Sequence, residues 1–143
     1  KLNATYGVCK DICVPAEAAL QIEIPMEVTA SPELAAVLAT VPTTAPDPAK
    51  DPLLKSWRVD DAAAKPKLVL EVKDPGGDDS DAFLFSPDGL YMPMTKKTSG
   101  GKGEAVFEVD LTDGVDIKDL KGKTLSLTLV GAKGQSETNI QLP

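Results

Sequence analysis

The chain has 143 residues, of which 42% are hydrophobic, which is enough for one well-packed domain and a smaller second part. Its 15 Lys and Arg residues against 22 Asp and Glu residues give a formal net charge of −7, so the clustered basic charge that nucleic-acid binding needs is missing. There is no histidine, which disfavours a hydrolase, and no apolar run approaches the roughly 18 residues of a spanning helix, which disfavours a membrane-embedded protein.

The only two cysteines, Cys9 and Cys13, lie near the amino end with three residues between them. Two thiols at this spacing can close a very small disulfide ring, which constrains little of the unfolded chain and adds less stability than a bridge across a long loop. Strained or exposed disulfides have higher reduction potentials and are the labile ones. The pair therefore favours thiol–disulfide exchange, with a passive turn clip or a pair of metal ligands as alternatives.

Residues 1–28 are expected to form a β-hairpin with the cysteines near its turn. Its strongest strand signal is the alternation of apolar and polar residues from Leu20 to Val28. Pro25 cannot donate to a strand ladder, which predicts an edge strand or the end of the pairing. A two-stranded hairpin is marginal alone, so we expect it to pack on another part of the protein or on a second copy, as in a strand-exchanged homodimer.

The segment Tyr6–Glu17 reads Tyr-Gly-Val-Cys-Lys-Asp-Ile-Cys-Val-Pro-Ala-Glu. It resembles the active-site hairpin of the DsbD amino-terminal domain family, which includes the suppressor-of-copper-sensitivity B type proteins. The resemblance covers about residues 1–28. It implies a periplasmic thiol–disulfide carrier on an immunoglobulin-like sandwich, acting as a thiol–disulfide oxidoreductase. It also implies that partner thiols attack Cys13 and that Cys9 is the resolving cysteine.

The chain departs from that family in the length that precedes the cysteine pair. Only eight residues precede Cys9, whereas most of the family domain, including the loop that shields the disulfide, comes before its pair. We therefore expect the chain to be a carboxy-terminal fragment of such a protein. The implied partners are periplasmic thiol or disulfide proteins, either thioredoxin-like or a membrane electron donor. Exchange of this kind requires no cofactor.

Residues 29–52 are expected to connect two domains. Ser31 as N-cap, Pro32 at the first helical position and Glu33 in the first turn predict a short helix over about residues 32–40. Four prolines follow between residues 41 and 52, which excludes a helix there and favours an extended, semi-rigid connector.

Residues 53–143 are expected to form a second immunoglobulin-like β-sandwich, which makes the fold class all-β with one short helix. Six or seven short strands are predicted, with alternating runs at 53–59, 67–72, 82–85, 105–111, 125–130 and 138–142. Turn residues fall at 75–77, 87–89, 99–101, 113–114 and 131–134, and a helical turn is expected at 116–121. This unit also resembles a DsbD-type sandwich, and without a cysteine it would be a redox-silent docking or spacer module.

Two further groups have metal-binding chemistry. Four aspartates surround the glycine pair at 76–77, namely Asp74, Asp78, Asp79 and Asp81. They could hold calcium, but a solvated acidic turn fits their spacing better. Met92 and Met94 suit copper(I), but methionine as core filler is the simpler interpretation. Trp57, the only tryptophan, is expected in the core or between domains.

The leading functional hypothesis is periplasmic thiol–disulfide interchange through Cys9 and Cys13. The alternatives are a redox-inert extracytoplasmic binding or adaptor module, in which the bridge is a permanent clip, and a copper-handling protein. Lys10 favours a thiolate at Cys9, but the neighbouring Asp11 largely cancels that charge. Ile12 and Val14 are expected to pack into the sandwich as an apolar frame around the pair.

Overall fold

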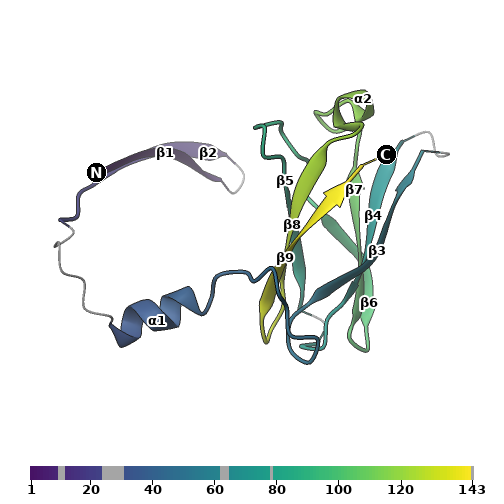
Figure 1. Ribbon diagram of the computed structural model, residues 1–143. Helices are drawn as coiled ribbons and strands as arrows, with labels where there is room; N and C mark the ends of the chain where they lie inside the picture. The colour runs from purple at the N-terminus through teal and green to yellow at the C-terminus, as the bar shows by residue number, and fades with distance from the viewer. Residues whose placement is uncertain (10–11, 24–30, 62–64, 78, 143) are drawn as a thin grey trace. The chain divides into compact units, whose positions relative to one another are not determined.

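The structure is a computed structural model that describes residues 1–9, 12–23, 31–61, 65–77 and 79–142. The chain divides into two compact units, Lys1–Ala35 and Ala36–Pro143. The first contains a β-hairpin and the second a β-sandwich (Figure 1). Within the described ranges, no helix has the length and apolar character needed to cross a membrane.

The hairpin of the first unit pairs β1 (Leu2–Cys9) with β2 (Cys13–Leu20) in antiparallel register. The predicted strand from Leu20 to Val28 is wrong in its described part, because residues 21–23 are not in a strand; residues 24–28 lie outside the described residues. The reason is pairing. Leu20 faces Leu2, the first residue of β1, so residues 21–23 have no partner backbone in that strand.

Helix α1 (Pro32–Leu38) follows the hairpin in the chain. The Leu34 N–H donates to the Ser31 hydroxyl oxygen at 3.0 Å, so Ser31 is the N-cap that the sequence predicts. The helix prediction is thus confirmed, although the helix ends at Leu38 rather than at residue 40.

The second unit contains two antiparallel sheets. The four-stranded sheet has the order β3 (Leu53–Asp60), β4 (Lys67–Lys73), β7 (Glu104–Asp110) and β6 (Lys96–Gly101). The three-stranded sheet has the order β5 (Asp81–Phe85), β8 (Thr124–Val130) and β9 (Gln135–Gln141). The predicted helical turn is α2 (Ile117–Leu120), which begins where the Asp116 carboxylate accepts the Lys118 N–H.

Labelled A to G in chain order, these strands give the ABED and CFG sheets of a constant-type immunoglobulin domain. The predicted immunoglobulin-like sandwich is therefore confirmed, and each of its six predicted strands is present. Strand β6 was not predicted, because its Ser99-Gly100-Gly101 end indicates a turn. It is an edge strand that pairs only with β7 and has a register shift between Lys97 and Ser99, so it needs few apolar residues.

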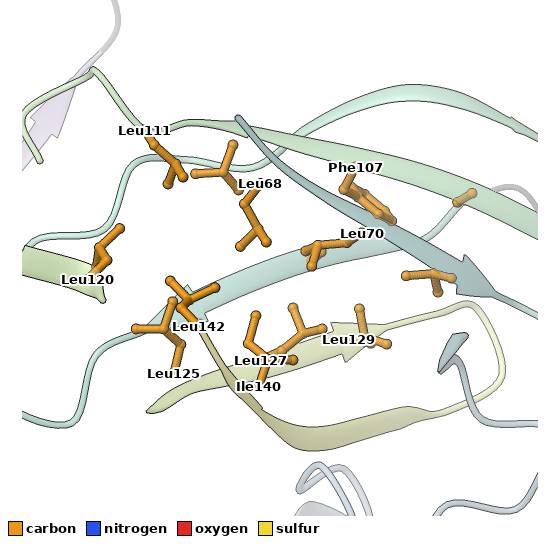
Figure 2. Packing of buried hydrophobic residues seen from close by; sticks show 14 residues of the cluster. Leu68, Leu70, Phe107, Leu111, Leu120, Leu125, Leu127, Leu129, Ile140 and Leu142 are labelled. Carbon is orange, nitrogen blue, oxygen red and sulfur yellow. The ribbon is translucent and has the colours of Figure 1, made fainter. Parts of the chain in front are cut away.

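The hydrophobic core lies in the second unit. Alternate residues of the central strands meet in one cluster, with Leu68 and Leu70 from β4, Phe107 from β7 and Leu127 and Leu129 from β8 (Figure 2). Each such side chain stabilises the fold by roughly 1.5–3 kcal/mol through removal from water. In the described chain, the buried hydrophobic residues all lie between Leu68 and Leu142. The core therefore includes no residue of the hairpin.

Residues 39–52 belong to the second unit, which begins at Ala36, whereas the sequence predicts a connector there and a domain start at residue 53. Thr43 makes a parallel bridge to β9, where its N–H donates to the Gln135 carbonyl and its own carbonyl accepts the Glu137 N–H at 2.9 Å. Prolines exclude a helix, but the backbone groups between them still find partners on a sheet edge.

Candidate functional site

The two cysteines are joined in a disulfide at the end of the hairpin, with their Cα atoms 4.0 Å apart. They form the last pair of the register, directly before the turn. Side chains of directly opposite residues in antiparallel strands lie on one face and close together. The hairpin register therefore brings together both site residues that the sequence predicts.

The two faces of the hairpin differ in chemistry. The register places small and polar residues on the face of the bridge: Asn3, Thr5, Gly7, Pro15, Glu17 and Ala19. It places only apolar residues and one tyrosine on the other: Leu2, Ala4, Tyr6, Val8, Val14, Ala16, Ala18 and Leu20. Cys9 and Cys13 are both exposed, and neither belongs to the hydrophobic core cluster.

Gly7 lies beside the bridge on the same face, opposite Pro15. A Cβ built on Gly7 would lie 3.6 Å from the Cys9 sulfur and 3.9 Å from the Cys13 Cβ, which is ordinary contact distance. The missing side chain thus leaves one flank of the bridge uncovered. Our sequence analysis missed this residue; the signal that could have found it is a glycine inside a run of strand-forming residues.

The residues between and beside the cysteines are placed only in part. Lys10 and Asp11, whose charges bear on the thiolate, lie outside the described residues. Ile12 is 80% exposed and Val14 is 61% exposed, and the hairpin is a two-stranded sheet with no second layer of its own. Their packing into a sandwich stays a prediction.

The acidic turn after β4 is not uniformly solvated. Asp74 is fully buried, its Oδ1 accepts the Gly76 N–H at 2.8 Å, and a Cβ on Gly131 would lie 2.9 Å from that same oxygen. The solvated-turn interpretation is therefore wrong for Asp74, since its carboxylate is enclosed by this turn and the glycine of another loop. Asp79 and Asp81 are exposed, and Asp78 lies outside the described residues. In the described part of the chain, no three His, Cys, Asp or Glu residues gather as a metal site.

The remaining residues singled out from the sequence belong to the sandwich. Met92 is partly buried and packs against the core, which agrees with the core-filler interpretation. Met94 is 82% exposed, so that interpretation is wrong for Met94. Trp57 packs on the core from β3, as expected for a core residue.

Asp51 is a buried carboxylate that the sequence analysis did not find. It is 4% exposed, and its Oδ2 accepts the Asp47 N–H at 2.8 Å, which closes the turn before β3. A Cβ on Gly134 would lie 1.9 Å from the Asp51 Oδ1, so this carboxylate fits only because residue 134 has no side chain. These contacts explain Asp51 as a structural residue that joins the turn to the β8–β9 loop.

Comparison of the chain with family models, with curated proteins and with solved structures finds no match. Function must therefore be inferred from the site itself. The bridge joins two exposed cysteines, neither of which belongs to the hydrophobic core cluster, and a disulfide is a reactive group.

Proposed function

We propose that the protein exchanges disulfides with partner proteins through the Cys9–Cys13 bridge. The observation that carries this proposal is the exposure of the bridge on a two-stranded hairpin, none of whose residues belongs to the hydrophobic core cluster. A ring this small stabilises a fold less than a bridge across a long loop. Exposure instead favours reaction with thiols, because access to the sulfur atoms governs the rate of exchange.

The chemistry needs only the bridge and a partner dithiol. A thiolate of the partner attacks one bridge sulfur, forms a mixed disulfide and expels the other cysteine as a thiolate, which takes a proton from water. The second partner thiolate then attacks the partner's sulfur of the mixed disulfide and releases the remaining cysteine. The partner gives up two electrons and ends as a disulfide, while Cys9 and Cys13 end as two thiols. The same steps in reverse oxidise the pair.

The resemblance of the Tyr6–Glu17 segment supports a finer version of this proposal. In it, the hairpin belongs to the DsbD amino-terminal domain family, Cys13 is the sulfur that partners attack, and Cys9 resolves the mixed disulfide. The compartment is the periplasm, where disulfides persist because conditions are oxidising. The partners are thioredoxin-like proteins or a membrane electron donor, and the cysteine-free sandwich serves as a docking or spacer module.

The first test measures how readily the bridge is reduced. The protein is equilibrated in graded thiol–disulfide buffers, free thiols are alkylated, and the reduced fraction is read from the intact mass. A midpoint between about −120 and −270 mV, the range of known exchanging carriers, supports the proposal. A bridge that stays closed below about −300 mV is a structural clip and overturns it, in favour of the redox-inert adaptor.

A second test assigns the roles of the two sulfurs. In Cys9→Ser the free Cys13 can form a mixed disulfide with a partner that carries an activated disulfide, and no resolving thiol can release it. Cys13→Ser is the matched control, with the same loss of the bridge and only Cys9 available. More adduct with Cys9→Ser supports Cys13 as the exchanging sulfur, whereas more adduct with Cys13→Ser reverses the assignment.

A further inference from the structure

Gly7 has no conformational reason to be a glycine. It lies in the middle of β1, and its φ angle is outside the left-handed region that favours glycine. Among the described residues, a Cβ at this position would meet ordinary contacts, at 3.6 Å and 3.9 Å. Alanine would therefore fit, and β-branched residues favour a strand more than glycine does. A glycine inside a strand often marks a place where a ligand or another backbone approaches closely.

The contacts identify what lies at that place. The two atoms nearest to the built Cβ belong to the cysteines of the bridge, the Cys9 sulfur and the Cys13 Cβ. Across the hairpin, Gly7 faces Pro15, which has no backbone N–H to donate. The pair next to the bridge on this face therefore carries no polar side chain, and Thr5 and Glu17 follow one pair further along.

We propose that Gly7 is a specificity-determining residue for exchange, because it leaves room for the backbone of a protein partner to lie beside the Cys9–Cys13 bridge. The occupant is an extended, cysteine-bearing segment of a protein dithiol, whose thiolate reaches the bridge while its backbone passes over Gly7. A small thiol needs much less of that space. Gly7 thus selects protein partners through access and takes no part in the bond changes. This inference rests on the proposed exchange function.

The test is a graded series at Gly7 in the full chain. Gly7→Ala adds the Cβ alone, and Gly7→Val adds a branched side chain that suits a strand. Ala19→Val is the matched control, because it adds bulk to the same face at the other end of the hairpin, opposite Asn3. For each oxidised protein, the rate of reduction is measured with purified thioredoxin and with dithiothreitol, and the midpoint potential is measured in parallel.

The expected result is an ordered loss of reduction by thioredoxin, small for Gly7→Ala and at least about tenfold for Gly7→Val, because exchange rates depend on access to the sulfur. Reduction by dithiothreitol falls by less than about threefold, and Ala19→Val behaves like the unaltered protein. Midpoint potentials stay unchanged in all variants, which shows that the bridge itself is unaltered.

Four results would overturn the inference. The first is a thioredoxin rate for Gly7→Val equal to that of the unaltered protein. The second is an equal loss of rate with both reductants, and the third is an equal loss in Ala19→Val, since neither depends on a partner backbone at Gly7. The fourth is a shifted midpoint potential that accounts for the change in rate. If the unaltered protein is not reduced by thioredoxin at all, the exchange function fails as well, so the two failures are distinguishable.

Discussion

Removal of the disulfide should open the hairpin and leave the sandwich intact. The bridge joins residues four positions apart, and a ring of that size stabilises the closed form by about 2 kcal/mol in the chain-entropy model. That is small for a domain with its own core. It is large for a two-stranded hairpin, which is marginally stable at best, and it corresponds to about a 30-fold change in the open population.

Hydrogen exchange followed by mass spectrometry tests this directly in the double variant Cys9→Ala/Cys13→Ala. Peptides from β1 and β2 should lose protection by up to about 30-fold, and peptides from β4, β7 and β8 should keep theirs. The sandwich should keep its thermal midpoint to within about 2 °C, because the buried hydrophobic residues all lie between Leu68 and Leu142 in the described chain.

The unaltered protein under reducing conditions is the control, and it should match the double variant. Undiminished protection in β1 and β2 would refute the argument, because some contact other than the bridge would then hold the hairpin. A clear fall in the thermal midpoint of the sandwich would refute it in a different way, since the core would then depend on the bridge.

Three predictions concern the sandwich itself. Leu127→Ala should lower the free energy of unfolding by about 2–5 kcal/mol in urea titrations, since Leu127 is fully buried in the core, and leave the midpoint potential of the bridge unchanged. Gly134→Ala should cost about 1–3 kcal/mol in the same assay, because its Cβ would lie 1.9 Å from the Asp51 Oδ1; unchanged stability would contradict that geometry. The Lys123 ammonium, together with a hydrogen bond from the Ser86 hydroxyl, lowers the pKa of Asp88 from 3.8 to about 2. The ionised carboxylate therefore stabilises the fold above about pH 4, and this stabilisation is lost as the pH falls toward about 2. The difference in thermal midpoint between the unaltered protein and Asp88→Asn should therefore shrink over that interval, and a constant difference would contradict the pKa shift.

The sandwich was predictable because its strands share one core. Each central strand must put every second residue into the same interior, so burial imposes the period-2 pattern on β4, β7 and β8. Edge strands escape this requirement. Strand β6 has Lys97 and Gly100 where a central strand would have apolar residues, and its pairing with β7 alone holds it in the sheet.

Alternation failed to predict a strand at residues 21–23 because a strand needs pairing as well as an apolar face. Periodicity reports which side chains favour burial, but a strand also needs a neighbouring backbone for its N–H and C=O groups. The register with β1 ends at Leu2 opposite Leu20, so residues 21–23 have no partner in β1. The sequence therefore indicated an apolar face, and the register determined that residues 21–23 lie outside the strand.

The two cysteines of the candidate site were predictable from the sequence, and the residues around them were not. Two cysteines at this spacing already imply a small ring, and the sequence predicted a hairpin with the pair near its turn. The register that places Cys9 opposite Cys13, with β2 over Cys13–Leu20, comes from the structure. What no pattern could show is the space on either side of the sulfurs. Gly7 is an unfavourable residue for a strand when considered alone. Its role can be inferred only from the register, which places Gly7 next to the bridge. Gly7 weakens the strand and relieves no clash within it, so its simplest explanation is the close approach of a partner protein.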